Sequence, residues 1–257
     1  MLICKLHIFL SFVLEGFVPY FCAKKEKKMK HVVFEPWIKD DLFKKGLKNR
    51  NRVLVLGHSH YCDRHPECPF RDKCRSTVSG CRDCRTDCHY MDEIQEEFPN
   101  EWKEKGLALN TQTEIEQFLK GNGQNTYKKF SNFMCKYFGY STEEFWNRIA
   151  YYNYVQYFLP SRGSKKYWIT KDQENDLAFE EMLTMLPALP DVIIAWGTVG
   201  NHLYDRYRVD GKSGEYKYLF KIKLQGEIVD VLNSYHPAYS LFKDGGKLKN
   251  SMDSIFL

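Results

Sequence analysis

Short runs of apolar residues alternate along this chain with longer segments in which apolar residues recur every three or four positions. The runs are typical of strands buried on both faces, and the periodic segments are typical of amphipathic helices. Strands are expected at Val53 to Leu56, Ile149 to Tyr157, Asp191 to Trp196 and Glu227 to Leu232. This alternation predicts an α/β fold in which helices cover both faces of a parallel sheet.

The expected helices have recognisable starts and ends. Thr111 with Glu114, and Ser141 with Glu144, form two capping boxes that each begin a helix. Further helices are expected from Pro36 to near Gly46, from Tyr127 to Tyr137, from Asp172 to Leu186 and from Thr198 to Tyr207, whereas residues 216–224 alternate only weakly. The apolar stripes on these helices are expected to build the core.

The composition changes this picture little. The chain has 257 residues, 43% of them hydrophobic, and a formal net charge of +5 at pH 7. That length is sufficient for one α/β domain with a substantial core, and we expect a single domain over residues 29–257. The mild positive charge permits nucleic acid as a partner and does not require it.

The first 28 residues differ from the rest. Apolar residues dominate from Leu6 to Ala23, with Glu15 and Pro19 inside the run. The run is compatible with a signal-peptide core or a poor membrane span. We favour a third interpretation, because residues 25–28 back-translate to a ribosome-binding site before Met29. Residues 1–28 are then a mistranslated leader, with a genuine N-terminal extension as the alternative, and we expect a cytoplasmic protein without a membrane partner.

Cysteines are concentrated in one short segment, which we treat as an insertion over residues 62–90. It has no apolar periodicity, so something other than a core must hold it together. We expect a structural metal site, zinc in preference to an iron-sulfur cluster, with reduced and unliganded thiols as the alternative. The candidate ligands are Cys68, Cys74, Cys81, Cys84 and Cys88, with Cys62, His65 and His89 nearby.

Few polar residues lie where the expected strands end. In open parallel sheets, ligands bind at the carboxyl ends of the strands, so these residues are the candidates for chemistry. They are His58, Ser59, His60 and Tyr61 after the first strand, Asn153 in the second, Gly197 after the third and His236 after the fourth.

Four features in order along the chain resemble the uracil-DNA glycosylase superfamily. They are a strand that ends in Gly57 and a polar loop, a strand that carries Asn153, the strand sequence VIIAWG, and a strand followed by His236 and Pro237. The resemblance covers Arg52 to Leu241 apart from the insertion. It implies a three-layer α/β/α fold with a central four-stranded parallel sheet.

The resemblance also implies a role for each strand end. Residues 57–62 lie where that superfamily has Gly-Gln-Asp-Pro-Tyr-His, the loop that positions or activates water. Tyr61 matches the tyrosine that closes the base pocket, and Asn153 matches the asparagine that reads the edge of the flipped base. His236 matches the histidine that stabilises the departing base, in a loop whose tip wedges into DNA.

The chain departs from the family at the water-activating residue. Ser59 stands where the superfamily has an aspartate, and His60 replaces the proline. Serine cannot act as a carboxylate base near neutral pH. We therefore expect His58, His60 or backbone carbonyls to hold the water.

Other candidate contacts to DNA are aromatic, apolar or basic. Phe70, Tyr239 and Leu241 are candidates for the pocket wall and the wedge, and Ser240 belongs to the same loop as the last two. Basic side chains suited to phosphate follow the second strand, although a solvated loop is the alternative there: Arg162, Lys165 and Lys166.

Together these features predict a monofunctional DNA glycosylase that flips a uracil or a modified pyrimidine and hydrolyses its N-glycosidic bond. The abasic product would serve DNA repair or defence against phage with modified cytosines. Two alternatives stay open: a metal-dependent hydrolase that uses His58 and His60, and a non-catalytic DNA- or base-binding protein of the same fold. No fingerprint for a nucleotide or flavin cofactor is present, and we expect a monomer.

Overall fold

The computed structural model describes residues 31–32, 34–61, 111–122, 124–159, 173–209 and 218–257. The leader at residues 1–28 and the Cys-rich insertion at residues 62–90 lie outside these ranges. The described residues contain the whole of the expected sheet. They therefore test the predicted architecture and most of the predicted strand-end site.

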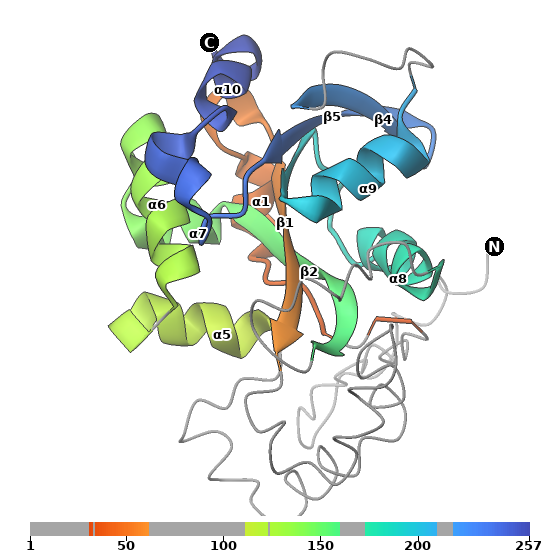
Figure 1. The fold of residues 1–257 in the computed structure, drawn as a ribbon, viewed down its shortest axis with the longest axis horizontal. Helices are drawn as coiled ribbons and strands as arrows, with labels where there is room; N and C mark the ends of the chain where they lie inside the picture. The colour runs from red at the N-terminus through yellow and green to blue at the C-terminus, as the bar shows by residue number, and fades with distance from the viewer. Residues whose placement is uncertain (1–30, 33, 62–110, 123, 160–172, 210–217) are drawn as a thin grey trace, which may run out of the picture.

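A five-stranded sheet forms the centre of the fold (Figure 1). Its strands are β1 (Val53–Tyr61), β2 (Ile149–Leu159), β3 (Val192–Trp196), β4 (Leu219–Leu224) and β5 (Glu227–Ser234), in the order β2-β1-β3-β5-β4. The first four strands in this order are parallel, and β4 pairs antiparallel with β5. The mixed α/β class is thus confirmed, but the expectation of four strands is wrong by one.

The additional strand is the weakly alternating segment before β5. Residues on one face of β4 are buried and those on the other are exposed, as is common in antiparallel strands with one solvated face. The strand turns back into β5 through Gln225 and Gly226, which both have positive φ angles, 48° and 97°. A two-residue hairpin turn needs this conformation at both positions, so the turn sets the antiparallel pairing.

The first strand is also longer than expected. Residues 57–61 were expected to form a polar loop, but β1 continues through them to Tyr61. The reason is that β2 extends to Leu159 and pairs with β1 along this length, with a shift of register between Ser59 and His60. The predicted loop residues are therefore held in a strand.

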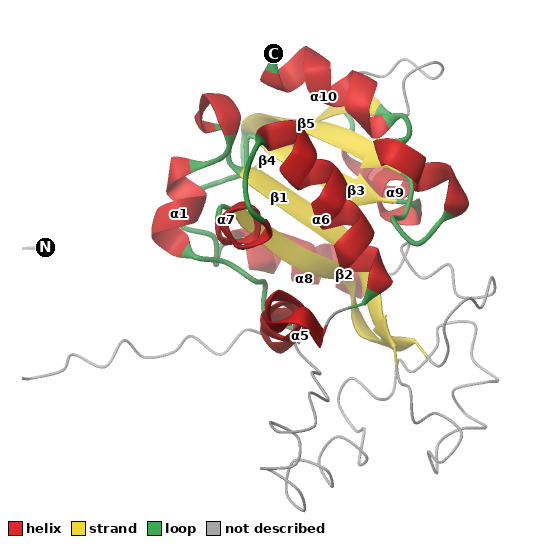
Figure 2. Ribbon diagram, turned by 90° about the vertical axis from the view of Figure 1, so that its left-hand side faces the viewer, coloured by secondary structure: helices red, strands yellow, loops and turns green. Residues whose placement is uncertain are grey.

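Alternate residues of the central strands face two separate cores, which makes the fold a three-layer arrangement (Figure 2). Val53 and Val55 of β1 pack with α6 (Asn125–Phe138), α7 (Thr142–Asn147) and α10 (Leu248–Phe256) on one face. Leu54 and Leu56 pack with α8 (Gln173–Leu183) and α9 (Thr198–Tyr207) on the other. Strands buried on both faces need apolar side chains at every position, which explains their continuous apolar sequences.

The helices follow the predicted pattern closely. Ser141 and Glu144 form the expected capping box, and α9 has the predicted bounds. No helix in the described ranges has both the length and the apolar character needed to cross a membrane. The helical segments are α1 (Asp40–Lys45), η1 (Lys48–Arg50), α5 (Thr111–Gln117), η4 (Phe118–Asn122), α6 (Asn125–Phe138), α7 (Thr142–Asn147), α8 (Gln173–Leu183), α9 (Thr198–Tyr207), η6 (Ser240–Gly245) and α10 (Leu248–Phe256).

Candidate functional site

The polar residues expected at strand ends lie at the carboxyl edge of the parallel strands. Gly57 of β1 is paired with Asn153 of β2. At the end of β3, the Gly197 N–H donates to the Ser234 carbonyl at 2.7 Å, which joins it to the end of β5. A Cβ atom placed on Gly197 would lie 3.5 Å from the Cβ of His236. The four strand ends thus bring their polar residues to one edge of the sheet.

Gly57 allows two polar side chains of β2 to lean across β1. A Cβ atom at position 57 would clash with the Tyr151 hydroxyl and with Oδ1 of Asn153. Both of these groups are buried in the sheet, so neither can move aside without disturbing its neighbours. The glycine after the apolar run is therefore required for close approach of the Asn153 amide.

Asn153 is hydrogen-bonded at both ends of its amide. Its Oδ1 accepts from the Tyr151 hydroxyl at 2.9 Å, and its Nδ2 lies 3.1 Å from Nε2 of His60. An amide nitrogen only donates, so Nε2 of His60 accepts this bond and Nδ1 carries the ring proton. The residue expected to read a base is thus oriented by two neighbours, and it is 2% exposed.

Glu114 completes this buried chain of hydrogen bonds, and the sequence analysis missed it. Its Oε1 lies 3.2 Å from Nδ1 of His60, and its Oε2 accepts from the Tyr127 hydroxyl at 2.6 Å. The expected capping box of Thr111 and Glu114 stays a prediction, and both oxygens of this carboxylate contact other side chains. Thr111, its supposed partner, places Oγ1 3.4 Å from Nε2 of His60. A glutamate at the start of a helix gives no sequence signal for such a contact.

His58 and His236 are a second pair of histidines at this edge, each half-buried. Burial, with a smaller electrostatic effect of His236, lowers the pKa of His58 to about 4. Burial also lowers the pKa of His236 to about 4. Both imidazoles are therefore neutral at physiological pH. His58 lies on β1 and His236 follows β5, with β3 between these two strands in the sheet.

The tautomer of His236 follows from its backbone contact. The Ala238 N–H donates to Nδ1 of His236 at 3.2 Å. In a neutral imidazole one nitrogen accepts and the other carries the proton, so Nε2–H is the donor. Trp196 lies against the ring, with the two ring centres 5.7 Å apart and nearly perpendicular planes. His236 is thus fixed as a neutral hydrogen-bond donor.

The other two predicted residues at the end of β1 are Ser59 and Tyr61. Ser59 Oγ lies 2.9 Å from Nδ1 of His58, so the serine orients that ring. Tyr61 ends β1 opposite Leu159 in the backbone pairing. The predicted role of Tyr61 as a pocket wall stays a prediction.

The loop after His236 presents apolar side chains to solvent. Tyr239 is 58% exposed and Leu241 is 53% exposed, and Ser240 between them is also exposed. Large exposed apolar side chains are uncommon in the described part of the chain, and two of the five lie in this three-residue stretch. The structure therefore leaves these predicted DNA contacts available to a partner.

A second polar cluster lies on the opposite face of the sheet. Asp176 of α8 accepts hydrogen bonds from the Tyr154 hydroxyl and from Nε2 of His202, each at 2.6 Å. Burial acts to raise the pKa of Asp176, but the bonds from His202 and Tyr154 lower it overall. The cluster links α8, α9 and β2, which is a structural role that the sequence analysis did not anticipate.

Several predicted residues lie outside the described ranges. They are Phe70, Arg162, Lys165 and Lys166, and the proposed metal ligands Cys68, Cys74, Cys81, Cys84 and Cys88. Within the described ranges, no group of three or more His, Cys, Asp or Glu side chains is arranged to hold a metal ion. The ring nitrogens of His60 contact Glu114 and Asn153, so the geometry does not favour His58 and His60 as a metal-binding pair.

Comparisons with known proteins give no match for this chain. No family model, no curated protein and no solved structure matches it. The geometry of the strand-end residues is therefore the basis on which a function can be proposed.

Proposed function

We propose that this protein is a DNA glycosylase that hydrolyses the N-glycosidic bond of a flipped uracil or modified pyrimidine and leaves an abasic site. The observation that carries the proposal is His236 at the carboxyl edge: its Nδ1 accepts from the Ala238 N–H, which leaves Nε2–H as a donor, and burial keeps the ring neutral at physiological pH. A resemblance in four ordered sequence features supports the same assignment. The four parallel strands of the sheet agree with it, and β4 is an addition at the edge.

The chemistry suits a site with few charged groups. The bond between C1′ of the sugar and the base nitrogen breaks, and its electron pair leaves with the base. Water forms the new bond to C1′ and loses a proton, which passes through solvent to the departing base anion, while positive charge develops transiently on the sugar. A donor aimed at the base oxygen stabilises the negative charge that develops there, which is typically worth about 3 to 4 kcal/mol. In this proposal Nε2–H of His236 is that donor.

Water would be held near His58 in this mechanism. With its pKa lowered to about 4, the His58 ring is a weak base, so it orients a water molecule by hydrogen bonding and does not remove its proton fully. Ser59 fixes the ring through their 2.9 Å contact. The developing sugar cation is itself strongly electrophilic. A positioned water can therefore attack it without an aspartate to act as base.

Asn153 would recognise the base through the hydrogen-bond donor and acceptor that its contacts within the protein leave unused. An amide offers two N–H groups and two acceptor lone pairs, and the two contacts to Tyr151 and His60 use one of each. The remaining N–H and lone pair match the donor and acceptor edge of a pyrimidine. Because His60 and Glu114 hold the amide in place, they act as positioning residues.

The proposal is tested by incubating the full chain with uracil-containing DNA, unmodified DNA and phage-derived modified DNA, and then measuring abasic sites by alkaline cleavage. We expect abasic sites on the first or the third substrate and fewer of them with Asn153→Ala. The substrate that reacts also decides between DNA repair and phage defence. Binding of DNA without abasic product on any substrate would indicate a non-catalytic binder and overturn the proposal.

A further inference from the structure

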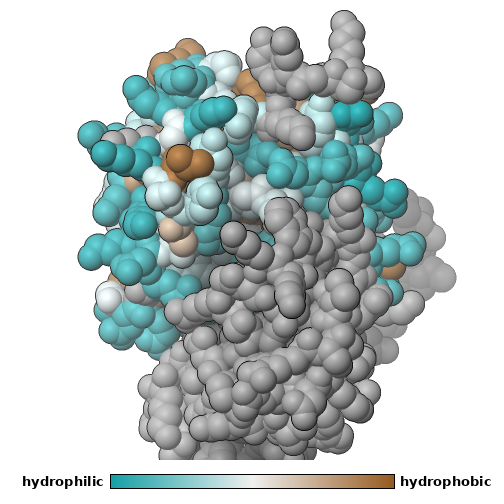
Figure 3. Space-filling view, viewed as in Figure 1, coloured by the Kyte–Doolittle hydropathy of each residue, from teal (hydrophilic) through white to brown (hydrophobic). Residues whose placement is uncertain are grey.

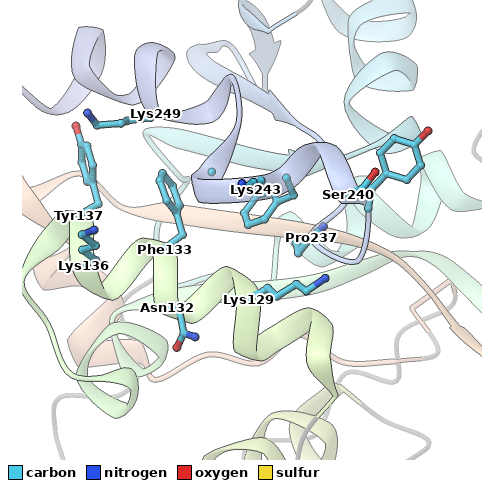
Figure 4. A pocket seen from close by; sticks show the side chains of 12 residues that line it. Lys129, Asn132, Phe133, Lys136, Tyr137, Pro237, Ser240, Lys243 and Lys249 are labelled. Carbon is cyan, nitrogen blue, oxygen red and sulfur yellow. The ribbon is translucent and has the colours of Figure 1, made fainter.

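An open groove of about 890 Å³ lies beside the loop that follows His236 (Figure 4). One wall is α6, and the other is formed by the segment from Pro237 through η6 to the start of α10. Figure 4 shows Lys129 of α6 near Pro237, and Lys136 and Lys249 toward the other end. The groove therefore begins at the candidate site and runs away from it.

The charge of this groove is one-sided. Its lining includes four lysines, Lys129, Lys136, Lys243 and Lys249, and no carboxylate. All four are exposed, and none of them forms an ion pair with another residue in the described ranges. The carboxylate of Asp253 in the adjacent α10 accepts a hydrogen bond from Tyr137 at 2.9 Å. The groove thus concentrates four uncompensated positive charges.

The surroundings of the groove are polar. In Figure 3 the described part of this side of the molecule is mainly hydrophilic, with isolated hydrophobic side chains. A groove that bound an apolar helix or a second protein core would need a continuous apolar floor. The buried Phe242 and the half-buried Phe133 give only a narrow aromatic strip between the lysines. The dominant feature that a partner would meet is positive charge.

We propose that this groove binds the sugar-phosphate backbone of DNA on one side of the flipped nucleotide. The inference rests on the proposed function for the identity of the ligand. Lysine side chains are mobile point charges that suit phosphates without reading sequence, and the polyanion supplies one charge at each nucleotide. The exposed Tyr239 lines the groove and belongs to the loop that follows His236, so the same loop borders the groove and carries the candidate donor.

The test is the salt dependence of DNA binding by the full chain. Binding of a labelled duplex is measured by fluorescence anisotropy from about 50 to about 200 mM salt. The variant Lys129→Gln/Lys136→Gln removes two charges from α6. Each lost phosphate contact lowers the slope of log affinity against log salt by about 0.9. The slope should therefore fall by about 1.8, so wild type loses about tenfold more affinity than the variant over this range.

A matched control makes the same change of charge elsewhere. Lys44 and Lys45 are exposed lysines of α1 that do not line the groove. Lys44→Gln/Lys45→Gln should leave the slope at the wild-type value. Lys243→Gln/Lys249→Gln, on the opposite wall, should reproduce the effect of the α6 variant.

The outcomes separate this inference from the proposed function. Equal slopes for the wild type and the α6 variant would overturn the groove, even if base release is normal. A reduced slope would support the groove, even if no base is released. Displacement of the duplex by polyglutamate as readily as by unlabelled DNA would also overturn the inference, because the groove would then recognise acidic protein.

Discussion

Replacing Glu114 by glutamine removes the carboxylate that ties α5 to His60 and α6. The carboxylate accepts from the Tyr127 hydroxyl at 2.6 Å and contacts Nδ1 of His60 at 3.2 Å. Glutamine has the same shape, but it offers one acceptor oxygen and one amide that only donates. Only one of the two donors, Tyr127 or His60, can then keep an acceptor oxygen, and that oxygen is no longer charged.

The expected loss follows from this mismatch. A hydrogen bond to a charged group contributes about 1.5 to 3 kcal/mol, and the Glu114 side chain is only 17% exposed, so water replaces it poorly. We expect Glu114→Gln to lower the free energy of unfolding by about that amount. For a domain of this size the melting temperature should fall by roughly 3 to 12 °C.

Urea denaturation at neutral pH measures this change. The control is Glu116→Gln, an exposed glutamate on the same helix, which should alter stability by less than about 0.5 kcal/mol. Base release should also slow in Glu114→Gln, because the orientation of His60 and Asn153 depends on the carboxylate. Equal unfolding midpoints for the two variants would refute the idea that Glu114 organises the site.

Three further predictions concern the same edge and the opposite face. Gly57→Ala should destabilise the protein by about 1 to 3 kcal/mol in urea, because its Cβ clashes with Tyr151; an unchanged midpoint would contradict the close approach. Titration of His58 and His236 by NMR should give pKa values of about 4, so activity should persist as pH falls through 6.5 and be lost nearer 4. Asp176→Asn should cost about 1.5 to 3 kcal/mol at pH 7. The lowered pKa of Asp176 stabilises the fold above its ordinary value of 3.8 and ceases to do so as pH falls through the folded value, so wild type and variant should converge in acid; a difference that is the same at pH 7 and in acid would contradict this.

Most of the fold could be predicted from periodicity, because strands buried on both faces and amphipathic helices leave clear patterns. The bounds of α9 and the Ser141 capping box are confirmed. The fifth strand was missed because its alternation of buried and exposed residues is confined to six positions, Leu219–Leu224, which is a short signal. The extension of β1 to Tyr61 was missed because it depends on pairing with β2, which is a tertiary effect.

The candidate site could be predicted only where residues follow strands. The placement of His58 and His236 at one edge of the sheet follows from the parallel order of β1, β3 and β5. Glu114 could not be found in this way, because its contact with His60 depends on how α5 packs across the end of β1. The same limit applies to the basic groove, because α6 is far in sequence from η6 and α10, which supply the other two lysines.

The central claim is that neutral His236 stabilises a departing base, and single-turnover release of base from the reactive DNA substrate tests it most directly. Free base is quantified by chromatography for the wild type and for His236→Ala, with unfolding midpoints measured to show that both are folded. We expect the variant to release base about 100- to 1,000-fold more slowly. Equal rates for the two proteins, or no base released from any substrate, would contradict the account.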